Sequence, residues 1–177
     1  SLGLFTLIGG LFILVDFLRL RFAPLNELTL VLMGPLMRDC ERNSIAGTTW
    51  LLAGVLLVAW IFPHEVTAIS ILFLAFADPV ASFIGLKFGK DKILGGKTLQ
   101  GFFGGYVACA LAGFSYLYFQ GQDALRSLVF AMIAALIGAL AELLPVAGID
   151  DNFTLPVFSA VGMYILFLVF GFFPVAG

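Results

Sequence analysis

Long apolar runs constrain this chain more than any other feature, because each is close to the length that crosses a bilayer. A membrane-spanning helix needs about 20 consecutive, mostly apolar residues. The composition, with 62% hydrophobic and 11% charged residues and a mean hydropathy of +1.11, is also that of a membrane protein. Six runs fit: Leu2–Leu18, Ile45–Phe62, His64–Leu86, Gln100–Phe119, Leu125–Leu144 and Thr154–Ala176. The sequence therefore predicts an all-α, polytopic integral membrane protein with about six transmembrane helices.

The segment between the first two runs, Phe22–Met37, is apolar but does not read as a span. Pro24, Asn26, Glu27 and Pro35 interrupt it. We expect a partly buried or interfacial segment there.

The whole of residues 1–177 is predicted to form a single transmembrane domain. The sequence starts at Ser1, without a methionine and already inside an apolar run. We therefore expect that further N-terminal spans of the full-length protein precede it.

The charged residues predict which ends of the spans lie together. Basic residues concentrate in cytoplasmic loops. If the segment after the first span is cytoplasmic, alternation of the spans places eight of the nine basic residues on that side: Arg19, Arg21, Arg38, Arg42, Lys87, Lys90, Lys92 and Lys97. The same side then holds the acids Asp39, Glu41, Asp78, Asp91, Glu142, Asp150 and Asp151. We expect an active site on the cytoplasmic face, and the absence of a basic surface argues against nucleic-acid binding.

Asp78-Pro79 is the first candidate site, within the stretch Ala75–Gly105. Proline removes a backbone donor, so the pair predicts a kink or break in the third span. An acid at membrane depth is a functional candidate by default, able to serve a cation or a substrate proton. The alternative is a structural aspartate paired with a lysine.

A glycine- and lysine-rich turn follows. Its glycines allow a ligand to approach the backbone, and its lysines supply positive charge for phosphates; the alternative is a loop that is basic for topology alone. Gly96-Lys97-Thr98 looks like the end of a P-loop, but Asp91 stands where that motif needs glycine. Thr98 is placed to cap the next helix, whose start would attract an anion.

Gly101 and Gly105 share a helix face, which predicts close packing of that helix.

Two further clusters of charged residues are candidate sites. Hard cations such as Mg²⁺ prefer carboxylate oxygens, so Glu142 with Asp150-Asp151-Asn152 could share a metal with Asp78; the alternative is a solvated turn. Arg38, Glu41 and Arg42 would share one face of a helix, or form a flanking belt of charge.

The segment DPVASFIGLKFGKDKILGGKTLQGFFGG, Asp78–Gly105, resembles the core motif of the CTP-dependent lipid-alcohol kinases. These are dolichol kinase, phytol kinase and the yeast-type diacylglycerol kinase, which group with the phosphatidate cytidylyltransferases. The family pattern falls on Asp78, Ala81, Gly85, Phe88-Gly89, Lys97-Thr98 and Gly101, and later on Glu142, Asp151-Asn152 and Pro156. The stretches Asp16–Arg21 and Arg38–Thr49 also look similar. The family's basic-plus-histidine motif, R/K-K-x-x-H, has no match here, and neither does the HGG-x-x-D-R motif of the cytidylyltransferases.

The resemblance implies a kinase that moves the γ-phosphate of CTP to the hydroxyl of a membrane lipid alcohol, with Mg²⁺. The acceptor would be a polyprenol, dolichol, phytol-like isoprenoid or diacylglycerol. The implied catalytic residues are Asp78, Lys97 and Asp151. The implied nucleotide-binding residues are Lys87, Gly89, Gly96, Lys97, Thr98 and Gly101. The implied metal ligands are Asp78, Glu142, Asp150, Asp151 and Asn152, with Arg38 and Glu41 in support. A cytidylyltransferase that makes a CDP-lipid and a small transporter are the alternatives, and homo-oligomerisation stays open.

Overall fold

The computed structural model describes residues 2–143 and 148–173. Within these ranges the chain is helical, and the only β-type pairing is an isolated bridge between Lys92 and Thr98. The α-helices are α1 Leu2–Arg21, α2 Ala23–Met33, α3 Gly47–Ile61, α4 His64–Phe88, α5 Leu99–Phe119, α6 Ala124–Leu143 and α7 Asp151–Phe170. Short 3₁₀ turns cover Gly34–Leu36 (η1), Asp39–Asn43 (η2) and Leu94–Gly96 (η3).

Each predicted span corresponds to one of these helices. Five of them, α1, α4, α5, α6 and α7, are long and apolar enough to cross a membrane, while α3 is apolar but has only 15 residues. The far ends of the fifth and sixth predicted spans, at residues 144 and 174–176, lie outside the described residues. The chain is an all-α, polytopic integral membrane protein, as the apolar runs predicted.

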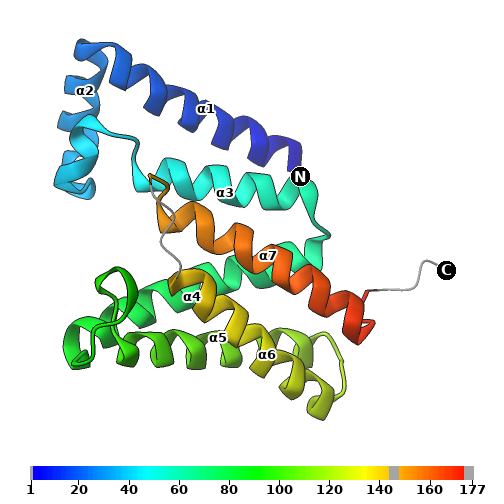
Figure 1. Ribbon diagram of the computed structural model, residues 1–177. Helices are drawn as coiled ribbons and strands as arrows, with labels where there is room; N and C mark the ends of the chain where they lie inside the picture. The colour runs from blue at the N-terminus through cyan, green and yellow to red at the C-terminus, as the bar shows by residue number, and fades with distance from the viewer. Residues whose placement is uncertain (1, 144–147, 174–177) are drawn as a thin grey trace.

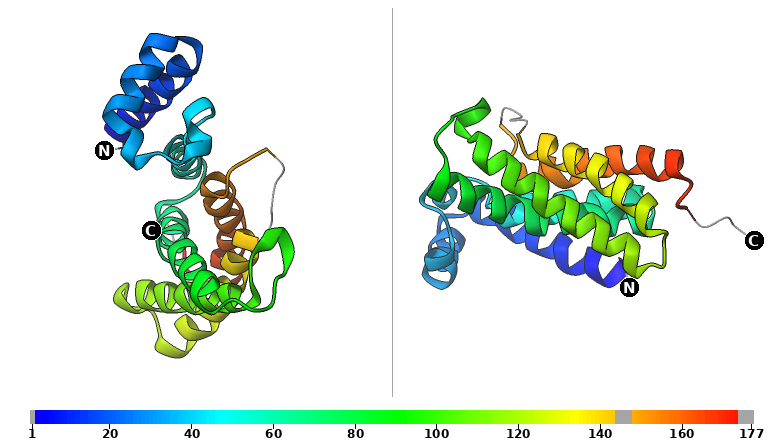
Figure 2. Two further views of the ribbon diagram at one scale, coloured as in Figure 1. Left: turned by 90° about the vertical axis from the view of Figure 1, so that its left-hand side faces the viewer. Right: turned by 90° about the horizontal axis from the view of Figure 1, so that it is seen from below.

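The helices form three layers (Figures 1 and 2). α1 lies on the outside against α3, α3 packs against α7, and α7 rests on α4 and α6. α5 completes the third layer between α4 and α6, and it contacts both. α7 shares the middle layer with α3 and contacts α4 and α6 of the third layer. Its first residue therefore lies close to the ends of helices that are distant in sequence.

Small residues allow the helices of the third layer to approach closely. Phe73 of α4 is fully buried, and a Cβ on Gly138 of α6 would lie 2.6 Å from its ring. The same Cβ would lie 2.9 Å from the sulfur of Cys109 on α5. Glycine is therefore required where α4, α5 and α6 meet, as is common between transmembrane helices.

The predicted packing of Gly101 and Gly105 is confirmed. A Cβ on Gly101 would lie 2.8 Å from the backbone oxygen of Ala81, and one on Gly105 would lie 3.3 Å from the Ala81 side chain. This close contact between α4 and α5 fixes the ends of both helices beside the turn that joins them.

Of the kink or break predicted at Asp78-Pro79, the break is wrong, because α4 continues as a helix through Pro79 to Phe88. Proline is tolerated inside membrane helices where neighbouring helices support the backbone. Here Ala77 and Ala81, on either side of the proline, are both buried, and Ala81 packs directly on α5. The contact with α5 holds α4 together where the sequence alone predicted an interruption.

The Phe22–Met37 segment forms no helix long enough to cross a membrane, in agreement with the prediction. It forms the 11-residue helix α2, with proline in its first turn, followed by η1. No residue of α2 is buried, although Leu25, Asn26, Thr29 and Leu30 are half-buried. α2 turns away from the end of α1 at the same end of the molecule as the α4–α5 connection (Figure 1).

Candidate functional site

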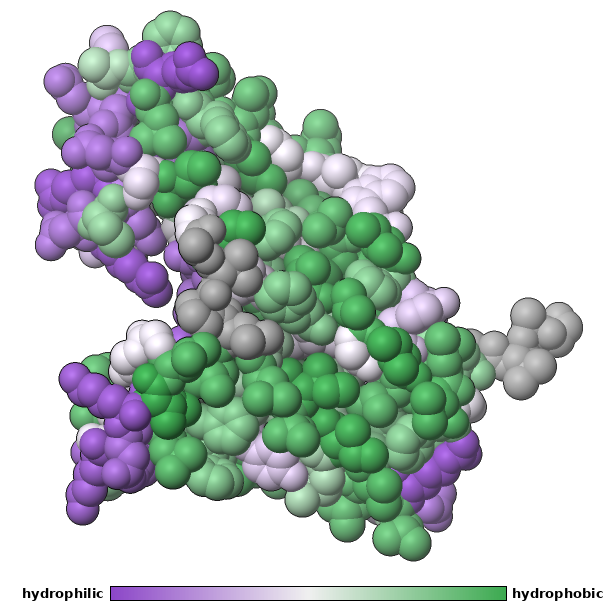
Figure 3. Space-filling model, viewed as in Figure 1, coloured by the Kyte–Doolittle hydropathy of each residue, from purple (hydrophilic) through white to green (hydrophobic). Residues whose placement is uncertain are grey.

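A cavity of about 290 Å³ opens at this end of the bundle. It is formed by the last turns of α4 and α6, the first turns of α5 and α7, and the connection before α5. Figure 3 shows hydrophilic surface on both sides of the notch at this end, over a mainly hydrophobic body. The lining residues are Asp78, Ala81, Ser82, Gly85, Leu86, Gly96, Lys97, Thr98, Gly101, Phe102, Glu142 and Asp151.

The three predicted catalytic residues line this one cavity together with Glu142. Asp78 lies on α4, and Lys97 lies two residues before the start of α5. Glu142 lies at the end of α6 and Asp151 at the start of α7. Three carboxylates therefore face one ammonium group. The predicted convergence of these residues on one surface is correct, while their chemical roles stay predictions.

Lys97 is the centre of the polar contacts in the cavity. Its Nζ lies 2.8 Å from Oε1 of Glu142 and 3.6 Å from Oδ2 of Asp151, and it also donates to the backbone oxygen of Glu142. The Glu142 side chain is only 7% exposed, whereas Lys97 is 31% exposed. The ammonium group thus sits between two carboxylates from different helices and ties the start of α5 to α6 and α7.

The connection before α5, residues Gly89–Thr98, folds into a hairpin. Ile93 N–H donates to the Lys97 backbone oxygen at 2.8 Å, and Leu99 N–H donates to that of Asp91 at 2.9 Å. Gln100, which the sequence reasoning missed, accepts from the backbone N–H groups of Lys90 and Asp91 and donates to the Asp91 carboxylate. The hairpin is therefore held firmly against α5, with Lys97 directed at the cavity.

Thr98 caps α5 as predicted. Its side-chain oxygen accepts a hydrogen bond from the Gly101 N–H at 3.2 Å, and α5 begins at Leu99. Gly96 has a positive φ of 81°, which favours glycine, and no atom lies within 4 Å of where a Cβ would be. Glycine is thus needed at residue 96 for the turn, which leaves the cavity edge open.

Two members of the predicted nucleotide-binding group are absent from the cavity lining. The ammonium group of Lys87 lies over the rings of Phe83 and Phe88, at 5.5 and 5.3 Å from their centroids. Gly89 packs inward, where a Cβ would clash with Thr98 and with the backbone oxygen of Gly85. Lys87 therefore packs on its own helix, α4, and Gly89 packs against the hairpin.

Of the acidic D-D-N turn, residues 150–152, only Asp151 lines the cavity. Oδ1 of Asp150 accepts from the Asn152 N–H at 3.0 Å, which caps α7. The side-chain nitrogen of Asn152 would lie 3.1 Å from a Cβ on Gly47, at the start of α3. Helix capping and packing therefore account for two of the predicted metal ligands.

Carboxylate chemistry at the cavity suits a hard cation, with one restriction. Among the described residues, no three His, Cys, Asp or Glu side chains are close enough to hold a metal by themselves. Mg²⁺, however, is commonly bound by one or two carboxylates together with substrate phosphates. Glu142 and Asp151 already share one cation, the Lys97 ammonium group, so the residues fit a metal that arrives with an anionic ligand.

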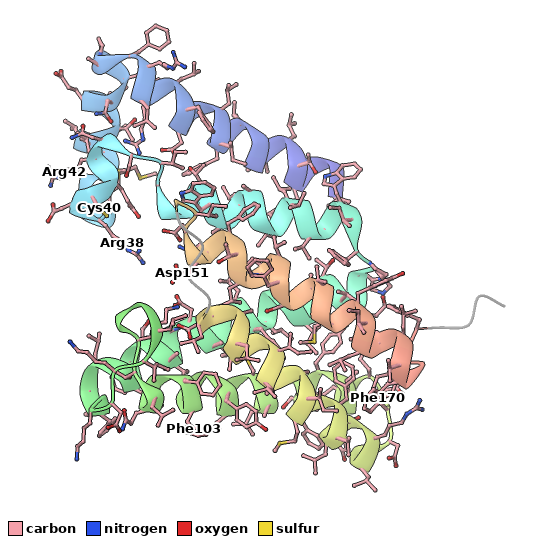
Figure 4. All side chains as sticks on the ribbon, in the orientation of Figure 1. Arg38, Cys40, Arg42, Phe103, Asp151 and Phe170 are labelled. Carbon is pink, nitrogen blue, oxygen red and sulfur yellow. The ribbon has the colours of Figure 1, made fainter. Side chains whose placement is uncertain are left out.

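The predicted helix around Arg38–Arg42 is a 3₁₀ turn, η2, that begins after Arg38. Glu41 stabilises it with both carboxylate oxygens, which accept from the Arg38 N–H at 3.1 Å and from the Gly47 N–H at 3.0 Å. The Arg38 side chain is exposed. Figure 4 shows it directed across the gap towards Asp151.

A buried ion pair behind this turn was missed as a site feature. Arg19 is 1% exposed and Asp16 is 5% exposed, and Arg19 Nε lies 2.6 Å from Asp16 Oδ1. Two charged residues near the end of an apolar run were the available signal. Hydropathy places them only at the charged end of the first span, because it cannot show that the next segment folds back over them.

The opposite end of the bundle carries fewer charges. Asp123 caps α6 by accepting from the Arg126 N–H at 2.9 Å, and Arg126 donates to the backbone oxygen of Phe170. Glu65 lies there beside His64. The uneven distribution of charge between the two ends agrees with the pattern predicted from the sequence.

Comparison with known proteins adds a family to this geometry. The chain is 34% identical over 161 residues to "CTP-dependent diacylglycerol kinase 1" of Schizosaccharomyces pombe, covering 85% of this chain and 74% of the relative. It is 30% identical over 172 residues to the protein of the same name in Saccharomyces cerevisiae, covering 86% of this chain and 59% of the relative. "Farnesol kinase, chloroplastic" of Arabidopsis thaliana is 30% identical over 100 residues, 51% of this chain and 32% of the relative.

No family model matches the chain, and no solved structure matches it significantly. The fission-yeast relative is nevertheless similar over most of both chains. The chain belongs to the family of CTP-dependent lipid kinases.

Proposed function

We propose that this protein transfers the γ-phosphate of CTP to the hydroxyl of a membrane lipid alcohol, in the cavity lined by Asp78, Lys97, Glu142 and Asp151. The observation that carries the proposal is the position of Lys97 between two carboxylates, facing a third, where four helices end. Phosphoryl transfer needs mainly positioning and charge neutralisation around a loose transition state. An ammonium group, carboxylates for a metal and a helix N-terminus supply those elements.

The phosphates of the nucleotide would bind at the start of α5. Lys97 and Thr98 face the cavity there, and the partial positive charge of a helix N-terminus favours an anion. The backbone at Gly96 allows a close approach, since it carries no side chain and no atom lies within 4 Å of where a Cβ would be. Lys97 would exchange its bonds to Glu142 and Asp151 for bonds to phosphate.

Glu142 and Asp151 are the proposed holders of Mg²⁺. Once Lys97 turns to the phosphates, these two carboxylates lose their shared cation, and a divalent ion is the natural replacement. When bound, Mg²⁺ would neutralise charge that develops on the transferred phosphoryl group. Asp150 and Asn152 hold the start of α7, so they orient Asp151.

Asp78 is the proposed partner of the lipid hydroxyl. It projects from α4 into the cavity, and no ion pair reaches it within the described part of the chain. A carboxylate placed beside the attacking hydroxyl can orient it and accept its proton. A membrane lipid would bring that hydroxyl to the end of the bundle, with its chains among the apolar helices.

We also propose that the cavity faces the cytoplasm, because eight of the nine basic residues belong to this end. Diacylglycerol is the acceptor to test first. The two yeast relatives are named for it and match over more of this chain than the farnesol kinase does.

The experiment is a substrate panel with the purified protein in lipid nanodiscs. CTP, ATP and GTP are each offered with Mg²⁺ and with diacylglycerol, farnesol, phytol or a polyprenol. We expect a lipid phosphate, with CTP strongly preferred. Formation of a CDP-lipid and pyrophosphate would replace the proposal with cytidylyl transfer. No turnover, together with substrate flux across liposomes, would replace it with transport.

A further inference from the structure

The buried pair Asp16–Arg19 is bound to the chain far beyond its own helix. Arg19 donates to the backbone oxygens of Glu41 at 3.0 Å and Ser44 at 2.8 Å, and to the side-chain oxygen of Asn26 at 2.9 Å. One guanidinium group therefore connects the end of α1 to α2 and to the η2 turn. Arginine suits this task because its planar donors have fixed directions.

The carboxylate of Asp16 extends the connection to α3. Its Oδ1 receives Arg19, and its Oδ2 accepts from the Ala46 N–H at 3.1 Å and from the Thr49 hydroxyl at 2.7 Å. Both carboxylate oxygens are thus used. The pair fixes both ends of the segment that leads from η2 into α3.

Burying such a pair is a poor way to gain stability. Removing two charges from water costs free energy, and well-packed apolar residues often stabilise as much or more. What the pair does supply is direction, because its hydrogen bonds converge on carbonyl groups of one short segment. A geometric role explains this arrangement better than a purely stabilising one.

The segment that it holds is Arg38–Ser44, whose side chains are otherwise largely exposed at the cavity end. Arg38, Asp39 and Cys40 are all exposed. The side chain of Arg38 is directed towards Asp151 at the edge of the cavity (Figure 4). Apart from Arg19, the bonds that reach this segment from outside it are those of the Glu41 carboxylate to Gly47 and of the Asn26 side chain to the Arg42 backbone oxygen, within the described part of the chain.

The charge of the cavity shows why the position of Arg38 matters. Three carboxylates line it against the single ammonium group of Lys97. Lys87 stands over two aromatic rings and does not line the cavity. A triphosphate entering here needs further positive charge, and the guanidinium of Arg38 faces the opening from the opposite side.

Resting on the proposed function, we propose that Arg38 binds the phosphates of the nucleotide, and that Asp16 and Arg19 are positioning residues that hold the Arg38–Ser44 segment for this contact. The hairpin before α5 and the Arg38–Ser44 segment would then contact the triphosphate from two sides. Small displacements of a positioned group have large effects on phosphoryl transfer. Holding the segment in place with the buried Asp16–Arg19 pair would therefore support catalysis.

The kinetic test compares Arg19→Lys, Arg38→Gln and the double variant, with Arg21→Gln as the control. Arg21 is exposed at the end of the same helix. Loss of a charged hydrogen bond is expected to raise the KM for CTP about tenfold in Arg38→Gln, with the KM for the lipid unchanged. Arg19→Lys should raise the KM for CTP several-fold on its own, but less than about twofold when Arg38 is already Gln.

Independent effects would contradict the proposal. If the two substitutions multiply in the double variant, Arg19 does not act through Arg38. An Arg19→Lys variant with the parent's KM for CTP would also overturn it. Thr49→Val, which removes one bond to Asp16, should act in the same direction as Arg19→Lys but more weakly, and it serves if Arg19→Lys fails to fold.

A second readout does not depend on kinase activity. Cys40 is exposed and Cys109 is buried, so a spin label attaches at residue 40. A second label at Lys92→Cys, in the hairpin, gives a distance across the cavity. We expect a narrow distance distribution in the parent and in Arg21→Gln, and a broad one in Arg19→Lys and Asp16→Asn. An unchanged distribution in those two variants would overturn the positioning role, even if the protein proved not to use CTP.

Discussion

Nζ of Lys97 and Oε1 of Glu142 lie 2.8 Å apart, although 45 residues separate them in the sequence. This contact joins the start of α5 to the end of α6. It also places the ammonium group within reach of Asp151 at the start of α7. Because Glu142 is nearly buried, the pair is part of the fold as well as part of the cavity.

Replacing Lys97 by Met separates these two roles. The Glu142 carboxylate would lose its partner in a buried place, so we expect a loss of about 1–3 kcal/mol of stability. The variant Lys97→Met/Glu142→Gln should recover much of that stability but no CTP-dependent activity. Thermal unfolding and an activity assay on the same samples check both points.

The other lysine of the prediction provides a comparison. Lys87→Met should raise the KM for CTP much less than Lys97→Met does, because Lys87 lies over Phe83 and Phe88. Equal effects of the two substitutions would show that the nucleotide reaches the outer side of the hairpin.

Asp78→Asn should abolish phosphoryl transfer while leaving CTP binding intact. Asparagine keeps the size of the side chain but cannot accept the hydroxyl proton as a carboxylate does. Equilibrium binding of a non-hydrolysable CTP analogue, measured beside turnover, checks the prediction. Full transfer by Asp78→Asn would refute the role assigned to this residue.

The Thr98 hydroxyl should stabilise the fold by capping α5. Thr98→Ala removes the oxygen that accepts from the Gly101 N–H, and loss of an N-cap typically costs about 1 kcal/mol. Thr98→Ser keeps the cap and should behave like the parent in thermal unfolding. If Ser and Ala destabilise equally, the contact of the threonine methyl group with the Gly89 turn matters more than the cap.

Gly101→Ala should push α4 and α5 apart, since the new Cβ would lie 2.8 Å from the Ala81 backbone oxygen. We expect a lower unfolding temperature and reduced transfer, because the same contact positions the cavity walls. Gly10→Ala is the matched control, as no atom lies within 4 Å of a Cβ there. Equal unfolding temperatures for the two variants would contradict the close packing at Gly101.

Hydropathy and charge in the sequence predicted some parts of the fold and of the cavity, and could not predict others. The apolar runs located every long helix because a bilayer requires that length, and the one-sided charges correctly placed Asp78, Lys97, Glu142 and Asp151 together. The continuation of α4 through Pro79 could not be predicted, since the support that α5 gives to α4 is a tertiary contact. The positions of Asp150 and Asn152 outside the cavity lining could not be predicted, because side-chain direction at a helix start depends on capping. The burial of Arg19 depends on a later segment folding back over α1, which no local pattern records.

The fate of labelled CTP tests the central claim most directly. Matched reactions contain the protein in nanodiscs, Mg²⁺, diacylglycerol and CTP that carries the label on either the γ- or the α-phosphate. A lipid kinase predicts that the γ-label enters the lipid fraction while the α-label stays in water-soluble CDP. Transfer of the α-label to the lipid, or no lipid labelling with diacylglycerol or with farnesol, phytol or a polyprenol in its place, would contradict the account.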